Sequence, residues 1–428
     1  MRTYINNINN LEDGSIIEID GWVQEIRKIK KLLFLIVRDN TGSVQVTVKD
    51  NMVKNYDSIY NISRESVIKV SGKLNKKSIS KSGVEILANE IIILNTAETP
   101  LPMGVIDLVD VDFDTRLNNR FIDLRKPENL IIFKFESELL FGIREYMNKN
   151  NFIEVHTPKI VAAATEGGAD LFPVQYFEKR AYLNQSPQLY KEILMSSGFD
   201  RVFEVGPAFR AEKENTVRHL NEFTSIDIEM SFSDDETVMR MLENAIAYSV
   251  NRADSILGKE LKGLGYSIEE VRPPFPRIEY SELINYLNDN GFKLNFGDDF
   301  SPEAMKFVSK KYNGFYFITK WPKDLRPFYT MPDDTNRNVT RSFDLQLRDI
   351  EVCSGAQRIH DYNMLENSFN EKGLNKNNFE FYIKAFKYGM PPHAGWGLGL
   401  ERLVMNLLNL SNVRESTLFP RDRSRLSP

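Results

Sequence analysis

The segment from Phe209 to Met230 constrains the fold of this chain more than any other part of its sequence. It places Arg210 and Glu212 before a polar, charged loop, and it ends in a run that alternates strictly between polar and apolar residues from Ser225 to Met230. Such alternation predicts a β-strand with one face toward a core. Two strands joined by this loop would direct cations, carboxylates and an aromatic ring into one pocket. A nucleoside triphosphate with its metal ion needs that mixture of groups.

The composition is that of an ordinary globular protein with more than one domain. A chain of 428 residues with 42% hydrophobic residues can build two or three buried cores. No apolar run approaches the ~18 residues that a membrane span needs, and the N-terminal residues lack the pattern of a secretory signal. The lone Cys353 and the four histidines argue against a disulfide framework and against a Cys- or His-rich metal centre. We therefore expect a soluble, cytoplasmic protein without a membrane partner.

The first hundred residues predict a small all-β domain. Five strand-like runs separated by turn signals fit a closed barrel of the OB type, a common nucleic-acid-binding fold. Its basic residues Arg27, Lys28, Lys30 and Lys31 could bind phosphates although the chain has a net charge of −5, and a solvated turn explains them equally well. The predicted strands are Ile16–Ile26, Leu32–Arg38, Ser43–Val48, Ser66–Gly72 and Val84–Leu94.

The remainder predicts a mixed domain of helices and strands. Apolar residues recur at helical spacing from Leu130 to Asn150 and from Leu400 to Leu408. A Gly-x-Gly-x-x-Gly after a strand and a Walker loop are both missing, so Rossmann and P-loop nucleotide sites are not supported. The expected strands are Phe152–His156, Ala181–Asn184, Arg201–Phe209, Phe223–Ser231 and Ser342–Val352. The sequence thus predicts an α+β multidomain protein with a barrel at 1–102, a connector at 103–130, and a larger domain at 131–428 that carries an insertion at about 232–340.

Two further segments carry residues suited to a nucleotide and its metal. Alternate glycines from Gly395 to Gly399 lead into a helix with Arg402 in its first turn, and this arrangement favours close approach of a ligand and binding of phosphate. The glycines alone are equally typical of a packing contact. Asp344, Glu351 and Ser354 offer the hard oxygen ligands that Mg²⁺ prefers. On their own, these residues also fit an edge strand with a polar outer face.

A third region combines a glycine pair with a lysine on a predicted helix. Residues 165–170 contain Gly167 and Gly168, and such a loop can close over a ligand. Gln188 and Lys191 follow in a stretch that predicts the first turns of a helix. Lys191 could point back at a ligand, and a solvated lysine is the alternative.

In this order, the segments resemble the signature motifs of class II aminoacyl-tRNA synthetases. The stretch from Phe152 to Pro158 resembles the first motif, the stretch from Arg210 to Phe223 the second, and Gly399–Arg402 the third. The resemblance covers nearly the whole chain. It implies a catalytic domain with an antiparallel sheet flanked by helices, an N-terminal anticodon-binding barrel, and a homodimer.

Within that class the chain is similar to the archaeal-type aspartyl-tRNA synthetases. The matching segments are 164–168, 188–191, 354–358 and the ending 419–426. Relatives that charge asparagine tend to lack the lysine that stands here as Lys191. An ammonium group pairs favourably with a carboxylate, whereas a neutral amide would leave it buried and unpaired. The resemblance therefore implies activation of L-aspartate with ATP and Mg²⁺, and transfer to tRNA(Asp).

The resemblance also assigns roles to individual residues. Arg210 would bridge the α-phosphate and the amino-acid carboxylate, Phe223 would stack under adenine, and Arg402 would cover adenine and reach the γ-phosphate. Glu351 and Ser354, helped by Asp344, would hold Mg²⁺. The residues implied for the aspartate are Glu166, Gln188, Lys191, Arg210, Ser354 and Arg358. The other residues implied to line the ATP site are Glu212, Arg218, His219, Leu220, Gly399, Leu400 and Glu401.

In the barrel, the resemblance implies that Phe34, Gln45 and Glu85 contact the anticodon, although Phe34 also fits the barrel core and Glu85 an exposed strand. Family members strictly specific for tRNA(Asp) tend to carry a Trp where this chain has Gln24, and a Lys in a late turn that is matched here by Lys81. Gln24 favours an enzyme that charges tRNA(Asn) as well.

Three alternatives are weighed against this interpretation. Lys191 disfavours an asparaginyl-tRNA synthetase. A paralogue without catalytic activity that only binds RNA is disfavoured because Arg210, Glu212, Glu351 and Arg402 are all present. An ammonia-dependent asparagine synthetase of the same class would lack the N-terminal barrel.

Overall fold

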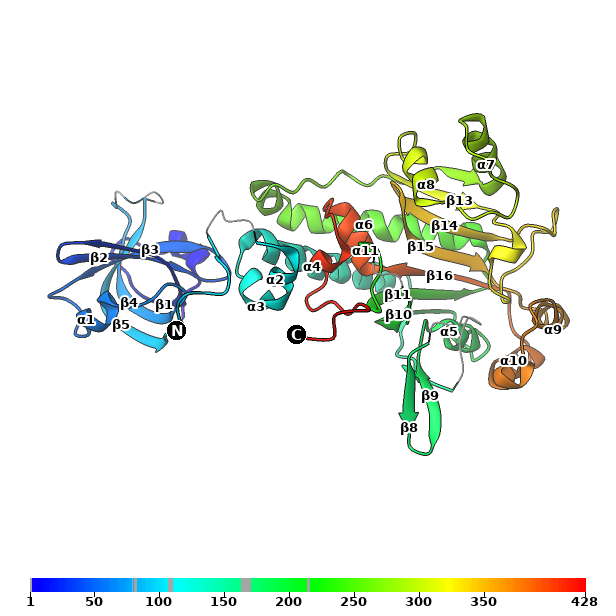
Figure 1. Cartoon of the computed structure of the whole chain (residues 1–428), viewed down its shortest axis with the longest axis horizontal. Coiled ribbons are helices and arrows are strands. Elements are labelled where there is room, and N and C mark those ends of the chain that lie inside the picture. The colour runs from blue at the N-terminus through cyan, green and yellow to red at the C-terminus, as the bar shows by residue number, and fades with distance from the viewer. Residues whose placement is uncertain (1, 79, 81–82, 107–110, 163–170, 214–215) are drawn as a thin grey trace. The chain divides into compact units, whose positions relative to one another are not determined.

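The computed structural model describes residues 2–78, 80, 83–106, 111–162, 171–213 and 216–428. The chain divides into two compact units, Met1–Asp112 and Phe113–Pro428, whose elements are shown in Figure 1. Glu166 and Lys81, to which the sequence assigns roles, lie outside the described residues. Among the described helices, we find none with the length and apolar content of a membrane span.

The first unit is a closed five-stranded barrel with strand order β1-β2-β3-β5-β4, as the sequence predicts. Alternate residues such as Leu33, Leu35 and Val37 are fully buried inside it, because successive side chains of a strand point to opposite faces. Its strands are β1 (Ile16–Ile29), β2 (Leu32–Arg38), β3 (Ser43–Lys49), β4 (Val67–Asn75) and β5 (Glu85–Asn95), with the short helices η1 (Ile5–Asn10) and α1 (Tyr56–Tyr60).

The second unit is built on an eight-stranded sheet of order β12-β13-β14-β15-β16-β11-β10-β6. All neighbours are antiparallel except β10 with β6 and β12 with β13. The sheet strands are β6 (Ile153–Glu154), β10 (Arg201–Phe209), β11 (Glu222–Ser231), β12 (Arg277–Glu279), β13 (Phe315–Thr319), β14 (Ser342–Leu347), β15 (Ile350–Gln357) and β16 (His393–Gly399). A separate three-stranded sheet holds β7 (Ile160–Val161), β9 (Lys179–Leu183) and β8 (Pro173–Tyr176).

Two long helices pack against the large sheet and form its main core. The helices α4 (Pro127–Lys149) and α6 (Asp235–Gly263) lie side by side along the sheet in Figure 1. They approach so closely that a Cβ atom at Gly142 would lie 2.9 Å from the Cα of Ser249. The remaining helices are α2 (Phe113–Asn118), α3 (Arg120–Asp123), α5 (Gln188–Met195), α7 (Tyr280–Asp289), α8 (Pro302–Val308), η2 (Lys323–Leu325), α9 (Tyr362–Glu371), η3 (Lys376–Phe379), α10 (Glu380–Lys387), α11 (Leu400–Leu407) and η4 (Val413–Ser416).

The structure differs from the sequence-based expectation in two places of this unit. The single strand expected over Ser342–Val352 is two antiparallel strands, β14 and β15, joined at a turn where Arg348 has a positive φ of 58°. The region 232–340 is no insertion as a whole, because α6 belongs to the main core and β12 and β13 extend the sheet. Within it, α7 and α8 form a small core of their own.

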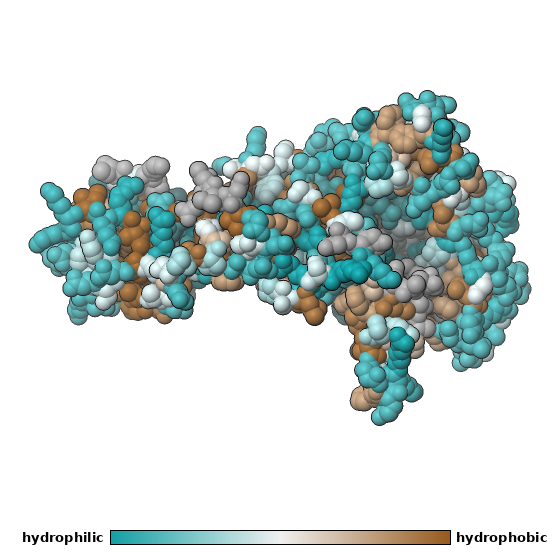
Figure 2. Space-filling model, in the orientation of Figure 1, coloured by the Kyte–Doolittle hydropathy of each residue, from teal (hydrophilic) through white to brown (hydrophobic). Residues whose placement is uncertain are grey.

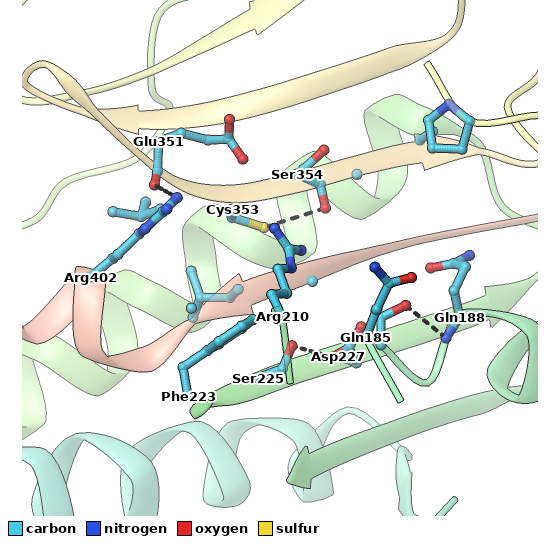
Figure 3. A pocket seen from close by; sticks show the side chains of 18 of the residues that line it. Gln185, Gln188, Arg210, Phe223, Ser225, Asp227, Glu351, Cys353, Ser354 and Arg402 are labelled. Carbon is cyan, nitrogen blue, oxygen red and sulfur yellow. Dashed lines mark hydrogen bonds between the residues drawn. The ribbon is translucent and has the colours of Figure 1, made fainter. Parts of the chain in front are cut away.

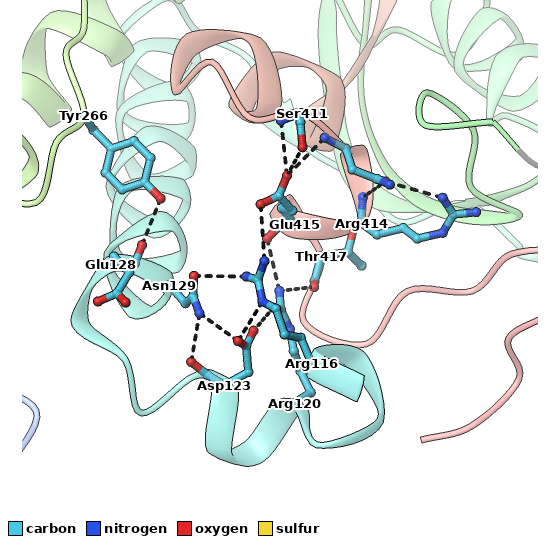
Figure 4. Close-up of polar contacts among 11 residues, drawn as sticks. Arg116, Arg120, Asp123, Glu128, Asn129, Tyr266, Ser411, Arg414, Glu415 and Thr417 are labelled. Atoms are coloured by element: carbon cyan, nitrogen blue, oxygen red, sulfur yellow. Dashed lines mark hydrogen bonds and ion pairs between the residues drawn. The ribbon is translucent and has the colours of Figure 1, made fainter. Parts of the chain in front are cut away.

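The stretch at 113–130, expected to be part of a connector, belongs to the second unit. The fully buried Arg120 donates hydrogen bonds to the carbonyl oxygens of Glu415, Thr417 and Leu418, at 2.9–3.1 Å, and to the carboxylate of Asp123 at 2.6 Å. Figure 4 shows this network between the short helices and the C-terminal segment. A buried guanidinium satisfied by so many acceptors fixes both segments in place.

The C-terminal segment in turn holds the loop between β10 and β11. The backbone N–H of Val413 donates to Val217 O at 2.9 Å, and the Arg414 guanidinium donates to Thr216 O at 3.3 Å. The N–H of Asn221 donates to Arg421 O at 2.8 Å. The loop is therefore held by residues that lie far away in the sequence.

Replacing Glu136 by Gln is expected to change how the stability of the protein depends on pH. Burial of this half-buried side chain on α4, with a smaller contribution from the Glu401 carboxylate, raises the pKa of Glu136 from 4.5 to about 8. Between those values the folded protein binds a proton that the unfolded chain releases, so the free energy of unfolding falls as the pH rises. Urea unfolding of Glu136→Gln should show a larger gain over wild type at about pH 8.5 than at about pH 5.5.

The exposed Glu178, between β8 and β9, offers a matched control. Glu178→Gln should leave the pH dependence of unfolding as it is in the wild type. If the free energy of unfolding of Glu136→Gln changes between the two pH values as much as that of the wild type, the assignment of the buried proton to Glu136 is wrong.

Candidate active site

A cavity of about 340 Å³ opens over the middle of the large sheet. Figure 3 shows Arg402 and Glu351 at one end, Gln185 and Gln188 at the other, and Arg210 between them. The structure thus brings together most residues that the sequence assigns to ATP and aspartate. Those in the cavity wall are Gln188, Arg210, Glu212, Arg218, His219, Leu220, Phe223, Glu351, Ser354, Arg358, Gly399, Glu401 and Arg402.

Arg210 and Phe223 form the centre of the cavity, from the two ends of the loop after β10. The Arg210 guanidinium lies 5.4 Å from the centroid of the Phe223 ring, which is within the range of a cation–π contact. The Asn221 side chain donates to the carbonyl oxygens of Arg210 at 2.7 Å and Glu212 at 3.1 Å. These bonds fix the backbone from which both functional side chains project.

Arg218 and His219, in the same loop, already have partners. Arg218 donates to Asp349 at 2.6 Å, and its carbonyl oxygen accepts from the Arg402 guanidinium at 3.3 Å. His219 lies 2.6 Å from the Thr216 hydroxyl, and its other ring nitrogen lies 3.8 Å from Glu212. The wall at this end is therefore polar and preformed.

The third motif contributes less to the cavity than the sequence suggests. Glu401 borders the cavity, but its carboxylate accepts the backbone N–H of Thr224 at 2.9 and 3.1 Å. Burial raises the pKa of Glu401 to about 7. Leu400 is buried in the main core and is not part of the described cavity wall. The implied ATP contact is thus not supported for Leu400, and Glu401 instead fastens α11 to β11.

The amino-acid end of the cavity rests on two buried cations, each paired with a carboxylate. Lys191, on α5, donates to Asp227 at 2.9 Å and to the carbonyl oxygen of Trp396 at 3.0 Å, and lies 3.6 Å from Glu229. Its side chain is 3% exposed, so the solvated alternative is wrong. Lys191 lies beneath the cavity wall rather than in it.

Arg358 is the second cation. Its Nε and Nη2 donate to the Glu229 carboxylate at 3.1 and 3.4 Å, and Nη2 also lies 3.4 Å from Oε1 of Gln188. Burial opposes the charge of this guanidinium, but the carboxylates of Glu229 and Glu192 raise the pKa of Arg358 above its ordinary value. Arg358 is consequently held as a charged group, and carboxylate partners fix the positions of both cations.

Sequence reasoning did not assign Asp227 and Glu229 to the site, although the signal was present. Both lie on the polar side of the alternating run in β11, which the sequence correctly predicts. What the pattern does not show is that this side is buried, at 3% exposure for Asp227 and 0% for Glu229. Buried carboxylates require partners, and Lys191 and Arg358 are those partners.

Among the glycines of β16, Gly395 serves this cluster, whereas Gly397 and Gly399 lie in the cavity wall. A Cβ atom at Gly395 would lie 2.2 Å from the Glu229 carboxylate and equally close to the carbonyl oxygen of Ile228. No side chain fits at that distance. Gly395 therefore leaves the space that Glu229 occupies, as expected for a packing contact.

The candidate magnesium ligands fall into two groups. Glu351 is exposed, and together with Ser354 it lies in the cavity wall. Asp344 is buried and outside that wall, and one of its oxygens accepts from Arg326 at 2.6 Å. Arg326 also donates to the Ser354 hydroxyl at 3.3 Å, so a cation already neutralises Asp344.

The donor set fits a magnesium ion that takes the rest of its ligands from substrate and water. Among the described residues no cluster of three His, Cys, Asp or Glu side chains is placed to hold a metal alone. The second oxygen of Asp344 is buried and has no hydrogen-bond partner in the described part of the chain. Glu351 and Ser354 are thus suited to a shared Mg²⁺, and the implied role of Asp344 is open only to that second oxygen.

In the barrel, Glu85 is the acceptor of a polar cluster on the outer face. Its carboxylate accepts from Gln45 at 3.0 Å, from Thr47 at 2.5 Å and from Asn75 at 2.9 Å. Partial burial alone would raise its pKa, but these hydrogen bonds and one from Ser78 hold the pKa of Glu85 below its ordinary value. Glu85 is thus partly buried and held in one orientation, so it is not a simple exposed strand residue.

Phe34 lies on the same outer side of the barrel. Leu33 and Leu35 fill the interior, whereas Phe34 is half-buried opposite Arg27 and Thr47, so the core alternative is wrong. Gln24 is the extra residue of a β-bulge, because the register between β1 and β2 shifts from Val23 to Glu25. Bulges redirect side chains, and the structure places Gln24 half-buried at this point.

Comparison with known proteins gives matches over both units. The family described as tRNA synthetases class II (D, K and N) matches residues 112–423, and an OB-fold nucleic acid binding domain matches residues 17–94. The chain is 63% identical over 428 residues, the full length of both chains, to an aspartate–tRNA(Asp) ligase of Picrophilus torridus. It is 48% identical to an aspartate–tRNA(Asp/Asn) ligase of Methanocaldococcus jannaschii, over 99% of this chain and 98% of the relative.

Among solved structures, the asparaginyl-tRNA synthetase of Pyrococcus horikoshii complexed with asparaginyl-adenylate is similar over 100% of both chains. The TM-score is 0.93 at 31% sequence identity.

Proposed function

The chain belongs to the class II tRNA synthetases of the D, K and N group, and we propose that it joins L-aspartate to tRNA in two steps driven by ATP. The observation that carries this proposal is the pair of buried cations at the amino-acid end of the cavity, Arg358 in its wall and Lys191 beneath it. Carboxylate partners hold both cations in fixed positions. A substrate carboxylate can accept from Arg358 and is attracted by the positive charge of Lys191 behind it, whereas a neutral amide gains less from these charges.

The first step is the attack of the aspartate α-carboxylate on the α-phosphorus of ATP. A new carboxylate–phosphorus bond forms, the bond to the β-phosphate oxygen breaks, and pyrophosphate leaves with its electrons. Arg210, between the two ends of the cavity, neutralises charge on the α-phosphate and on the attacking carboxylate. Phe223 stacks against adenine, while Arg402 covers its other face and reaches the γ-phosphate. Such preorganised cations are a main source of catalysis in enzymes without a nucleophile of their own.

Residues of the cavity wall would hold the metal. Glu351 and Ser354 would bind a Mg²⁺, which would supply positive charge that neutralises the phosphates. By the family resemblance, Glu166, which lies outside the described residues, would bind the α-amino group of aspartate. Glu212, Arg218 and His219 line the remaining ATP site.

In the second step, a hydroxyl of the terminal ribose of tRNA attacks the carbonyl carbon of the adenylate. The ester bond forms, AMP leaves with the electrons of the mixed anhydride, and the hydroxyl proton is released. The anticodon is bound by the outer face of the barrel, where Phe34 stacks on a base. Gln45 and Glu85 contribute polar contacts, and the family resemblance adds Lys81, which lies outside the described residues. Stacking of an aromatic ring on a base is worth ~1–3 kcal/mol.

We propose that tRNA(Asp) and tRNA(Asn) are both substrates. Their anticodons differ in the third base, which is C in one and U in the other, and these pyrimidines exchange the positions of a donor and an acceptor. The amide of Gln24 carries both a donor and an acceptor and can turn to suit either base. The Picrophilus torridus relative is named for tRNA(Asp) alone and the Methanocaldococcus jannaschii relative for both, so the range has to be measured.

We further propose a homodimer formed through the edge of the large sheet. The edge strand β6 exposes Ile153 at 52% and the nearby β7 exposes Ile160 at 47%, within and beside the segment that resembles the first motif. Unpaired edge strands and exposed apolar side chains favour association with a second copy.

In the wild type, aspartate should drive exchange of pyrophosphate into ATP. Arg210→Ala should lower the kcat of this exchange at least about 100-fold, because a donor that stabilises the charge on the phosphate is lost. The measurement is ATP–pyrophosphate exchange with aspartate or asparagine. Arg240→Ala, on the exposed side of α6, is the matched control and should exchange like the wild type. Exchange driven by asparagine instead of aspartate would contradict the proposal.

Radiolabelled aspartate should be transferred to transcripts of both tRNA(Asp) and tRNA(Asn). Gln24→Trp should lower charging of tRNA(Asn) by about tenfold or more and affect tRNA(Asp) less, because the rigid ring cannot exchange donor and acceptor. Equal charging of both transcripts by this variant would show that Gln24 does not determine which tRNA is charged. A wild type that charges tRNA(Asp) alone would show that discrimination has another source.

Light scattering of the full chain should give twice the monomer mass of 49.5 kDa. Ile153→Asp introduces a charge at the proposed contact and should yield monomers, while the exposed Ile256→Asp on α6 should remain dimeric. A monomeric wild type at micromolar concentration would exclude a stable dimer.

A further inference from the structure

A buried polar cluster lies directly behind the amino-acid end of the cavity. It consists of Glu192 on α5, Tyr382 on α10 and His393 on β16, and each of these residues is 0% exposed. None of the three belongs to the described wall of the cavity. Glu192 precedes Tyr382 by 190 positions and His393 by 201, and neither sequence pattern nor resemblance assigns the three residues a role.

Two donors hold one oxygen of Glu192. The Tyr382 hydroxyl donates to Oε2 at 2.7 Å, and Nε2 of His393 lies 3.1 Å from the same oxygen. The other ring nitrogen of His393 lies 2.8 Å from the carbonyl oxygen of Pro391, which can only accept, so Nδ1 carries a hydrogen. Burial alone would raise the pKa of Glu192, but the hydrogen bond and charge of His393 lower it. Glu192 is therefore an ionised, immobilised acceptor.

The second oxygen of Glu192 decides how the amide of Gln188 is oriented. Nε2 of Gln188 donates to Oε1 of Glu192 at 2.7 Å, which directs the amide oxygen of Gln188 toward Nη2 of Arg358 at 3.4 Å. In the opposite orientation, the amide oxygen would face a carboxylate and two N–H₂ groups would face each other.

The orientation of Gln188 matters because it decides which part of Arg358 is available. Nε and Nη2 of Arg358 are used by Glu229 and Gln188. Nη1 has no hydrogen bond in the described part of the structure. Since a guanidinium is planar and rigid, fixing two of its nitrogens also fixes the direction of the third.

We propose that Glu192, held by Tyr382 and His393, is a positioning residue that orients Gln188 and, through it, Arg358 for recognition of the substrate's side-chain carboxylate. This inference rests on the proposed function and deepens it. Substrate specificity then depends also on three residues behind the cavity wall, Glu192, Tyr382 and His393, which do not contact the substrate. Glu192 acts on the affinity for aspartate and on its preference over asparagine, not on the chemistry at phosphorus.

The test uses Glu192→Gln and the milder Tyr382→Phe in the full-length protein. An amide at position 192 presents a donor as well as an acceptor, so it no longer imposes one orientation on Gln188. In ATP–pyrophosphate exchange, KM for aspartate should rise about tenfold in Glu192→Gln and about threefold in Tyr382→Phe, while KM for ATP and kcat stay within about twofold. The inhibition constant of asparagine should change less than KM for aspartate, so the preference for aspartate shrinks.

Tyr280→Phe is the matched control. Tyr280 is also 0% exposed and donates its hydroxyl to a carbonyl oxygen, that of Asp298 at 2.7 Å, in the separate small core of α7 and α8. Its removal should lower the urea midpoint without moving KM for aspartate.

The possible results distinguish a failure of the inference about Glu192 from a failure of the proposed function. If Glu192→Gln and Tyr382→Phe lower stability as Tyr280→Phe does and leave KM for aspartate unchanged, the cluster is structural and the inference is overturned. A parallel rise of KM for ATP would overturn it as well, since the effect would not be specific to the amino acid. If the wild type shows no aspartate-dependent exchange at all, the proposed function fails instead.

Discussion

Four buried charges, Lys191, Asp227, Glu229 and Arg358, form the arrangement on which the catalytic unit depends. Each side chain is at most 5% exposed, and every cation lies within 3.6 Å of a carboxylate. Moving such charges out of water costs several kcal/mol per ion, and removal of one partner leaves another uncompensated. Here each buried cation has a carboxylate partner, and each carboxylate has a cation. These pairs connect β11, which lies between β10 and β16, to the helix α5.

The cluster also explains why the cavity lies where it does. Strand β11 pairs with β16 over Ser225–Ser231, and Gly395 in β16 gives Glu229 the space it needs. The carbonyl oxygen of Trp396 in the same strand accepts from Lys191. The sheet therefore serves as both the structural core and the floor of the substrate site. Binding a carboxylate there requires little rearrangement, because the Arg358 guanidinium is already held in place.

Many elements of the fold and residues of the candidate site could be predicted from local sequence patterns. The features that could not be predicted have a common cause. The alternation around Asp227 predicts the strand and its polar face, and the stretch after Pro187 predicts the first turns of the helix that carries Lys191. By contrast, the partner of Asp344 is Arg326, and the partner of Glu192 is His393, which lies 201 positions away. A single sequence contains no signal for such pairings, because they are created by the order of strands in the sheet.

The same reasoning explains the missed turn after β14 and the contact that Glu401 makes with β11. In β14 all six residues are buried, so no alternation marks where the strand ends, and the turn at Arg348 is not signalled by a glycine or proline. Glu401 follows a glycine-rich stretch typical of phosphate sites, yet the backbone N–H of Thr224 takes its carboxylate. The type of a residue indicates which interactions its side chain can make. Only the fold determines which neighbouring group it interacts with.

The attachment of the loop at 210–221 to the C-terminal segment has a consequence for biosynthesis. A ribosome produces this loop about 200 residues before it produces the segment around Val413 and Arg414 that binds its carbonyl oxygens. At typical rates of ~5–20 residues per second, the interval is roughly 10–40 s. During that time the loop, which includes the exposed Val217, lacks these partners. The substrate site is thus among the last parts of the nascent chain to acquire its final form.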